Sequence, residues 1–598
     1  MRSSRPYSRA ILTLLILCST ALVAQNPKNP GVLQKYTGTA SAHMRFLASE
    51  AGKQMLLQSP SPAALPLLQR FHPDAVGQYH PRPPVTPAAS DADARQPQTQ
   101  VAAYAGGHRA ISVTGCGTAS GTVMNNESAI GAVAQGQPSV DFMLSELGAG
   151  KDLVAETALD ARYELGGLDS LTGIYVHRDP SVSCYGGSDV DMGNPAIADP
   201  LNPGDFLFSE GSGRVLADDN SAHKQFLFVD NRLDDTTSGI GLRRVPASNF
   251  ESTSICPAGT LSGGQEATCL GTKAIIVNAS LDNVSDTPAI AQDTRSSGTG
   301  AGDIYIVNPS LRVLRSVMVL TACKATFTTA ADCSDPLIIS ASGQDGPVSP
   351  SVAVVQGGPN AGTIVITYVY TDQIIYISCT PGGAPNRPTC GHHSTVRTDS
   401  NMVTLITDNP LEITPWPSIA ARTDSGGQTL FVVWSTCKNT PTFPLIACPD
   451  ADIVMDVATN VTSPSWAFHH VTTSSGHQIL PSIAYDTGQN MINIAYYSTS
   501  SDYYKNRVVM KMNQIPSGSI TPGSTLSVTT SYDSLEGDGT LFGFEEGTLG
   551  SYMGLAAHGG SAQGSSHVYL GFTNSTRLGT YGSDTNTQSD NNVSQVTY

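Results

Sequence analysis

The 598-residue sequence predicts an all-β protein: a β-propeller of six to eight four-stranded blades, with seven as the preferred number, behind a short helical and proline-rich N-terminal segment. Three observations predict this fold. A strand–turn–strand phrase recurs along the chain, it recurs at a steady period, and the composition suits strands and turns. With 57 glycines and only 14% charged residues, the chain resembles proteins built from strands joined by turns rather than from long helices.

The N-terminus has the pattern of a secretory signal peptide over residues 1–24. Arg2, Arg5 and Arg9 precede a long apolar run, and Ala24 is a small residue of the kind found before a cleavage site. Removal of these three arginines would change the net charge from −17 to −20. No later stretch is long and apolar enough to span a bilayer. We therefore expect a secreted or cell-surface protein that folds in an oxidising compartment.

Residues 25–100 are predicted to hold one helix followed by a linker. The stretch SAHMRFLASEAGKQMLLQ suits a helix, whereas Pro, Ala, Gln and Asp dominate residues 59–100. The propeller is then expected to occupy residues 101–598.

The recurring phrase consists of Pro-x-(Ile/Val)-Ala, a glycine-rich turn and a second strand, as in SPSVAVVQGGPNAGTIVITYVY. Six copies align, in steps of 63, 62, 67, 64 and 72 residues, on Gln225, Pro288, Pro350, Pro417, Pro481 and Met553. A unit of this size suits a four-stranded blade, which must pack against its neighbours to bury its faces. We expect Pro-x-Ile-Ala to begin the innermost strand of each blade, because Pro at a strand's first residue costs no ladder hydrogen bond.

Ten cysteines remain outside the signal peptide, and eight of them form close pairs 13, 10, 11 and 11 residues apart. The pairs are Cys256/Cys269, Cys323/Cys333, Cys379/Cys390 and Cys437/Cys448. Metal sites favour gaps of two to four residues and recruit histidines, so we predict local disulfides, one in each of four consecutive blades. Three should follow the third strand of a blade, and the fourth should lie between the second and third strands, on the opposite rim. Cys116 and Cys184 are left to pair with each other.

The phrases PSIAYD…INIAYYS, SYMGLAA…VYLGFTNSTR and ADIVMDVATN resemble secreted bacterial propellers of the sialidase-like (Asp-box) superfamily, from about Asn125 to the C-terminus. That superfamily includes sialidases, other glycosidases and non-catalytic binding proteins, so the resemblance implies a fold more than an activity. The intact Asp-box, Ser-x-Asp-x-Gly-x-x-Trp, is absent from the sequence. We expect disulfide-closed loops to fasten the turns in its place.

The resemblance also implies a site on the rim where the inner strands begin. Sialidases use a Tyr–Glu nucleophile pair, an acid and arginines that clamp a carboxylate. The residues predicted for these roles are Glu546 and Tyr552 as the nucleophile pair, Asp502 as the acid, Arg243, Arg507 and Arg577 as the clamp, and Tyr503 and Tyr504 as sugar-stacking rings. Three further carboxylates, Asp230, Asp293 and Asp486, are expected to shape turns on the other rim.

The most favoured function is recognition of an extracellular glycan or protein. The second is a sialidase-type exo-glycoside hydrolase, and the third is a structural cell-surface module. The acidic charge argues against a nucleic-acid partner, which needs a basic stripe. We expect no cofactor and no catalytic metal. Structural calcium at SDVDMGN or DTRSSGTGAGD stays an open alternative, although neither has calcium-loop spacing.

Overall fold

The computed structural model describes Ala75 and most of the chain between residues 102 and 597. The longer gaps in that range are 116–134, 146–151, 161–171, 179–189, 439–447, 501–506, 535–552 and 558–566. The predictions for the signal peptide, for residues 25–100 other than Ala75, and for Cys116 and Cys184 lie outside the described residues.

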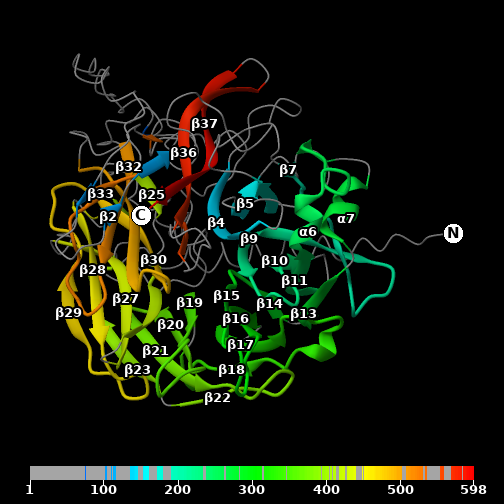
Figure 1. The fold of residues 1–598 in the computed structure, drawn as a ribbon, viewed down its shortest axis with the longest axis horizontal. Coiled ribbons are helices and arrows are strands. Elements are labelled where there is room, and N and C mark those ends of the chain that lie inside the picture. The colour runs from blue at the N-terminus through cyan, green and yellow to red at the C-terminus, as the bar shows by residue number, and fades with distance from the viewer. Residues whose placement is uncertain are drawn as a thin grey trace.

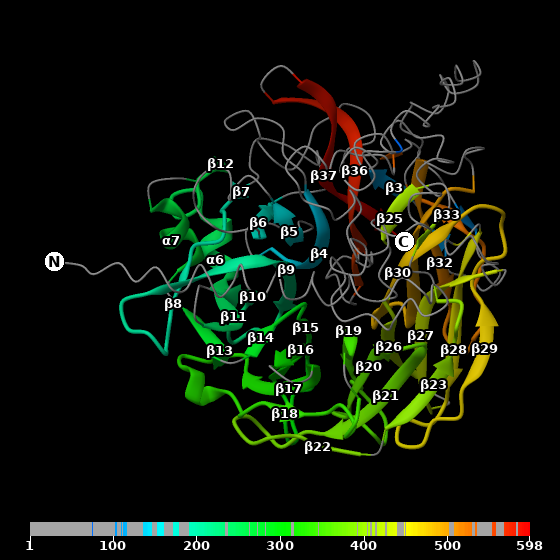
Figure 2. The same ribbon diagram turned by 180° about the vertical axis from the view of Figure 1, so that it is seen from behind.

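Seven sheets of four or five strands are arranged around a common axis (Figures 1 and 2). Six of them, blades 1 to 6, follow one another along the chain, and a seventh, the closing blade, completes the ring. All pairings among the described strands are antiparallel except that of β12 with β7. The predicted propeller of six to eight four-stranded blades is therefore confirmed.

The first three blades contain the described helical segments as well as strands. Blade 1 consists of β4 (Gln135–Leu144), β5 (Asp152–Asp160), β6 (Thr172–His177) and β7 (Val190–Asp191), with β12 (Gly259–Thr260) added at its edge. Blade 2 consists of β8 (Ile197–Ala198), β9 (Phe206–Asp218), β10 (Gln225–Leu233), β11 (Ser238–Pro246) and β13 (Ala274–Ser280). Blade 3 consists of β14 (Asn283–Ser285), β15 (Ala289–Gln292), β16 (Asp303–Arg312), β17 (Ser316–Lys324) and β18 (Leu337–Ile338). The helical segments are α6 (Ala247–Glu251), α7 (Gln265–Leu270) and η4 (Ala330–Asp332).

In the later blades, the described regular elements are all strands. Blade 4 consists of β19 (Val348–Val354), β20 (Ile364–Tyr370), β21 (Gln373–Thr380), β22 (Thr389–Cys390) and β23 (Ser394–Thr398). Blade 5 consists of β26 (Ser418–Asp424), β27 (Gly427–Cys437), β28 (Ala451–Ala458) and β29 (Ala467–His470). Blade 6 consists of β30 (Gln478–Asp486), β31 (Met491–Ser498), β32 (Arg507–Ile515), β33 (Leu526–Ser527) and β34 (Asp533–Ser534). Two small sheets pair β1 (Ala102–Ala103) with β2 (Arg109–Ala110) and β24 (Leu405–Ile406) with β25 (Asn409–Glu412).

The closing blade joins strands from opposite ends of the propeller region. It consists of β35 (Gly554–Ala557), β36 (His567–Tyr581), β37 (Asp584–Thr597) and β3 (Ser112–Gly115). Ser112 of β3 pairs with Thr597 of β37, so the two ends of the ring are held by ladder hydrogen bonds. Closure of this kind leaves every inner strand between two neighbours.

In five of the six aligned copies, the repeated phrase forms the inner strand of its blade, as predicted. The exception is the copy at Gln225. That residue begins β10, the second strand of blade 2, and the inner strand of this blade is β9. The alignment failed because β9 carries Arg214 and Val215 where the other copies have Pro-x-Ile-Ala. As a consequence, Asp230 lies within β10 and not at the end of an inner strand, so its expected place on a turn is wrong.

The repeated prolines take two positions, only one of which was predicted. Pro288 and Pro417 immediately precede β15 and β26, as expected. In β4, β19 and β30 the strand starts earlier, and the register shifts between Gly136 and Ser139, Val348 and Ser351, and Ile479 and Ser482. Each of these bulges contains the proline, and a bulge also leaves a residue unpaired, so the missing N–H costs nothing.

The core consists of apolar clusters between adjacent blades. One of them packs Val365 and Tyr376 of blade 4 against Leu430 and Trp434 of blade 5. The Trp434 side chain is completely buried, and its indole N–H donates to Asp399 Oδ2 at 2.8 Å. Each blade thus buries both faces against its neighbours, as the repeat predicted.

The four close cysteine pairs form local disulfides, one in each of blades 2 to 5, as predicted. They are Cys256–Cys269, Cys323–Cys333, Cys379–Cys390 and Cys437–Cys448, and their Cα–Cα distances lie between 3.9 and 5.6 Å. Three follow the third strand of a blade, while Cys437–Cys448 joins the end of β27 to the start of β28. Because strand direction alternates within a blade, this last disulfide lies on the rim opposite the other three.

The local structure around Cys269 differs from the prediction, although its pairing does not. The disulfide was expected to fasten a turn between strands, but Cys269 lies in α7 and its side chain is completely buried. The connection from β11 to β13 is long, and its segment Gln-Glu-Ala-Thr-Cys-Leu includes several residues of good helix propensity. Cys256–Cys269, with Cα atoms 4.8 Å apart, therefore fastens a short helix to blade 2, and the expectation of a simple turn at Cys269 is wrong.

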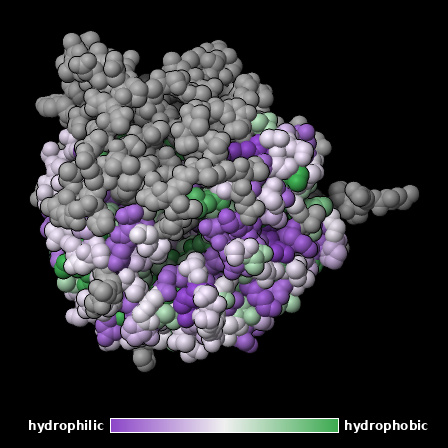
Figure 3. Space-filling model, in the orientation of Figure 1, coloured by the Kyte–Doolittle hydropathy of each residue, from purple (hydrophilic) through white to green (hydrophobic). Residues whose placement is uncertain are grey.

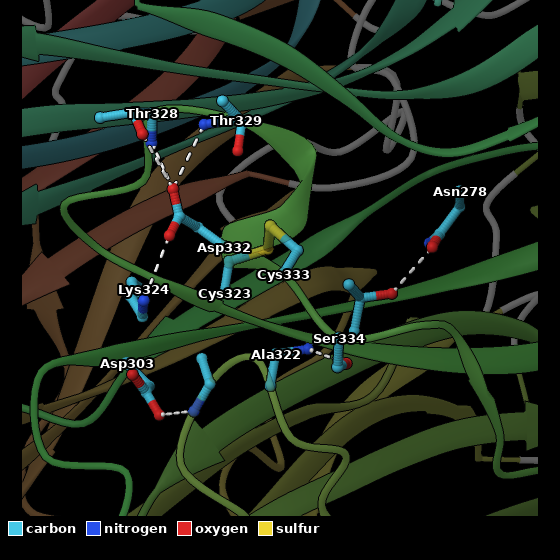
Figure 4. Close-up of a disulfide and its surroundings, with 12 residues drawn as sticks. Asn278, Asp303, Ala322, Cys323, Lys324, Thr328, Thr329, Asp332, Cys333 and Ser334 are labelled. Atoms are coloured by element: carbon cyan, nitrogen blue, oxygen red, sulfur yellow. Dashed lines mark hydrogen bonds and ion pairs between the residues drawn. A yellow bond between two sulfur atoms is a disulfide. The ribbon is translucent and has the colours of Figure 1, made fainter. Parts of the chain in front are cut away.

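Figure 4 shows how the loop of the Cys323–Cys333 disulfide is fastened. The Asp332 carboxylate accepts from the backbone N–H groups of Thr328 and Thr329, at 2.8 and 3.3 Å, and forms an ion pair with Lys324 at 3.1 Å. These hydrogen bonds, the largest effect being that from Thr328, hold the pKa of Asp332 well below its ordinary value. A carboxylate and a disulfide therefore fasten the same turn, and the replacement of Asp-box turns by disulfides stays a prediction.

Candidate functional site: the central channel

A cavity of about 280 Å³ lies on the propeller axis, and the inner strands of all seven sheets line it. The described lining residues come from β4, β9, β15, β19, β26, β30 and β35, or directly precede these strands. Figure 3 shows one face of the molecule, where hydrophobic residues lie in a recess near the middle with hydrophilic residues beside them. The channel is thus the place where all blades meet.

Equivalent positions of the seven inner strands form a ring around this channel. The ring consists of Ser139, Arg214, Ala289, Ser351, Ser418, Ser482 and Gly554. Three of the serines bridge to the next blade, because their hydroxyls accept from the N–H groups of Val215 at 3.3 Å, Ile419 at 3.1 Å and Ile483 at 3.3 Å. Adjacent inner strands are therefore linked by side-chain hydrogen bonds, which satisfy N–H groups that no ladder reaches.

Position 554 of the ring requires glycine. A Cβ on Gly554 would lie 2.7 Å from the backbone nitrogen of Val140, on the inner strand of blade 1. The closing blade therefore approaches blade 1 more closely than a side chain would permit, which sets the diameter of the channel at this point.

Arg214 gives the ring its one basic side chain among the described residues. Its guanidinium carbon lies 5.2 Å from the centre of the Trp416 ring, although the two residues come from blades 2 and 5. These blades stand on opposite sides of the axis, so the Arg214 side chain extends across the channel. A guanidinium over an indole face is attracted by the ring quadrupole, with about 0.5–1 kcal/mol at exposed sites and more when water is excluded.

Asp141 is the one carboxylate among the described residues that line the channel. Its Oδ2 accepts from the N–H of Ala217 at 2.7 Å, and its Oδ1 accepts from the N–H of Phe142 at 2.9 Å. Both oxygens therefore support the backbone around β9 and β4. An indole, a guanidinium, a carboxylate and several hydroxyls around one small cavity can bind a polar ligand that has an apolar face.

The structure describes only some of the site residues predicted from the sequence. Asp502, Tyr503, Tyr504, Glu546 and Tyr552 lie outside the described residues. Arg507 begins β32 and Arg577 lies in β36, and their backbones alone are described. Their predicted roles therefore stay predictions.

Arg243 is described in full and lies away from the channel. It was expected on the rim where the inner strands begin, but it lies toward the end of β11, the third strand of blade 2, which runs to the opposite rim. The rim placement is wrong for the same reason as the alignment of Gln225. The guanidinium instead lines a second cavity next to β8, and its Nη2 donates to the carbonyl oxygen of Pro195 at 3.0 Å.

The described carboxylates in the two acidic stretches considered for calcium have protein partners, whereas Asp189 lies outside the described residues. Asp293 forms an ion pair with Arg295 at 2.6 Å, and Asp303 Oδ2 accepts from the N–H of Ala384 at 2.6 Å. Asp191 Oδ1 accepts from the N–H of Gly193 at 3.3 Å. In the described part of the chain, no group of three or more His, Cys, Asp or Glu side chains is placed to hold a metal ion.

Of the three carboxylates expected to shape turns, two do so. Asp486 Oδ1 accepts from the N–H groups of Gly488 and Gln489, at 2.9 and 3.1 Å, and Asp293 Oδ1 accepts from the N–H of Arg295 at 3.2 Å. These are the local hydrogen bonds by which aspartate favours turns.

Sequence reasoning missed Arg214, Trp416 and Asp141, although signals for two of them were present. Trp416 directly precedes the proline of its repeat, and Asp141 follows Pro138-Ser139-Val140, which matches Pro350-Ser351-Val352. Arg214 has no such signal, because its strand lacks the repeated phrase.

No family model matches this chain, and no curated protein matches its sequence. Among solved structures, it is similar to a triple arginine-to-alanine mutant of AofleA from Arthrobotrys oligospora, at 9% identity and a TM-score of 0.33, over 67% of this chain and 89% of that one. It is also similar to a B. megaterium levansucrase mutant, at 11% identity and a TM-score of 0.27, over 52% and 85% of the two chains. A third is the α-L-arabinofuranosidase PaAbf62A from Podospora anserina, at 9% identity and a TM-score of 0.27, over 52% and 89%. TM-scores this low do not identify a shared family.

Two further findings concern the compartment. Four disulfides are consistent with an oxidising environment such as the cell exterior. Within the described ranges, the helices are all too short or too polar to cross a bilayer.

Proposed function

We propose that this chain is an exported recognition protein that binds a glycan in its central channel. The observation that carries the proposal is the Arg214–Trp416 pair in a cavity of about 280 Å³. An indole offers an apolar platform for the face of a sugar ring, while guanidinium, carboxylate and hydroxyl groups suit its hydroxyls. A cavity at the lower end of the usual size range suits a terminal sugar better than an internal chain segment.

Recognition is favoured over hydrolysis by the number of carboxylates. A glycosidase of the usual kind needs two carboxyl groups within about 10 Å of each other, facing one pocket. Among the described residues of the channel wall, Asp141 alone is a carboxylate, and both of its oxygens already accept backbone hydrogen bonds. Sialidase-type hydrolysis through Glu546, Tyr552 and Asp502 is the alternative.

A glycan array probed with residues 25–598 tests the proposal, followed by titration calorimetry on any glycan that binds. We expect Trp416→Ala and Arg214→Gln to weaken that binding by tenfold or more. The matched control is Phe468→Ala. Phe468 lies on β29, the outer strand of blade 5, and forms another cation–π pair with Arg397, at 4.6 Å. Its replacement removes an aromatic ring away from the channel and should leave glycan binding unchanged.

Two outcomes would contradict the proposal. One is an array with no binding above background, and the other is wild-type affinity in both channel variants. Release of sialic acid from a fluorogenic sialoside, abolished by Glu546→Gln, would replace recognition by the hydrolase alternative.

A further inference from the structure

A second cavity lies outside the channel, next to blade 2, and has a volume of about 440 Å³. Segments around β8 and β13 form most of its wall, and α7, η4 and β11 supply the rest. Every lining residue is alanine, isoleucine, proline or glycine except Arg243. The guanidinium of Arg243 is thus the one polar side chain among the described lining residues.

The Arg243 side chain is buried and poorly satisfied. The residue is 5% exposed, and Nη2 donates to the Pro195 carbonyl oxygen at 3.0 Å. Its Nε is buried and has no hydrogen-bond partner among the described residues. A guanidinium has five N–H donors in a planar fork, so most of its capacity is left unused.

The carboxylate of Asp230, on the neighbouring strand β10, is already bound to another arginine. Asp230 binds Arg232 through both of its oxygens, at 2.9 Å to Nε and 2.8 Å to Nη2, and it also accepts from Asn194 at 2.6 Å. Among the described residues, these two guanidinium groups and one carboxylate leave one positive charge uncompensated. Burial, together with the charge of Arg232, lowers the pKa of Arg243 to about 10, so it remains charged at neutral pH.

We propose that this cavity is a binding site for a small organic carboxylate with an apolar body. A carboxylate matches the planar fork of a guanidinium and supplies the missing single negative charge. The apolar wall would cover the rest of the molecule. Inorganic phosphate fits less well, because its further oxygens would face alanine and isoleucine side chains without donors.

The cavity is independent of the proposed glycan site. It lies against β13, the outer strand of blade 2, and none of its lining residues lines the channel. Loss of one site should therefore leave the other intact.

Titration calorimetry with hexanoate as the probe, at pH 7, tests the proposal, with hexanol and inorganic phosphate as matched probes that lack the charge or the apolar body. We expect saturable binding of one hexanoate per chain, and no saturation with either matched probe. Arg243→Gln should weaken hexanoate binding by about tenfold to a hundredfold, the effect of losing a charged hydrogen bond.

A second variant keeps the test valid if Arg243→Gln does not fold. Ala267 is an exposed residue of α7 that lines the cavity, so Ala267→Trp should fill the space without disturbing Arg243 and should abolish binding. The control Arg387→Met removes an exposed arginine elsewhere and should bind like the wild type. The proposal is overturned if hexanoate does not bind, if hexanol binds equally well, or if Ala267→Trp retains wild-type affinity.

Discussion

The buried carboxyl group of Glu156 provides a test of the packing between blade 1 and the closing blade. It lies in the middle of β5, where its backbone pairs with Val140 on one side and Tyr175 on the other. Val154 and Ala158, which share its face of the strand, belong to the apolar cluster between blade 1 and the closing blade. The carboxyl group is completely buried, and neither of its oxygens has a hydrogen-bond partner in the part of the chain that the structure describes.

Burial raises the pKa of Glu156 well above its ordinary value of 4.5. The native state therefore keeps a proton that the unfolded state releases as the pH rises above 4.5. Because the native state then binds more protons, stability falls with pH by about 1.4 kcal/mol per pH unit until the native pKa is reached. The contribution of this residue is thus most favourable in acid and is lost toward neutral pH.

Glu156→Gln removes the titration while keeping the shape of the side chain. We expect the two proteins to be similar in stability near pH 4.5, and the variant to gain about 1.4 kcal/mol over the wild type for each pH unit above it, up to the native pKa. Urea unfolding from pH 4.5 to 8 measures this difference. Asp335→Asn, at a carboxylate with an 83% exposed side chain, is the control and should run parallel to the wild type. A constant difference between Glu156→Gln and the wild type across this range would refute the reasoning.

Three further predictions concern backbone strain, the disulfides and export. Ser349 has a left-handed φ of 56°, and its buried hydroxyl has no partner among the described residues. Ser349→Gly should therefore stabilise the protein by about 1 kcal/mol in urea unfolding, and a loss of stability would contradict this. Replacing Cys437 and Cys448 by serine opens a loop of 11 residues and should cost about 3 kcal/mol, whereas an unchanged unfolding midpoint would show that the bond contributes nothing. The exported protein should begin near Gln25, which mass spectrometry of the mature chain checks, and an intact Met1 in the mature protein would contradict the prediction.

The sequence by itself determined the features that depend on neighbours along the chain. The propeller was predictable because each blade is a local unit, so its strands and turns recur in the order in which they are read. The four disulfides were predictable for the same reason, since each pair closes a loop of 10 to 13 residues inside one blade. The turns at Asp293 and Asp486 also depend only on residues next to them.

The tertiary structure alone decided which strand of blade 2 faces the axis and which side chains meet across the ring. The phrase at Gln225 resembles an inner strand because a second strand of a buried sheet has the same apolar character, and only ring closure places β9 inside it. Arg214 and Trp416 lie far apart in the sequence, and they meet because blades 2 and 5 face each other across one channel. The uncompensated charge of Arg243 could not be predicted from the sequence either. It arises because Asp230 forms its ion pair with Arg232, and the packing of side chains, not their spacing along the chain, determines which arginine Asp230 binds.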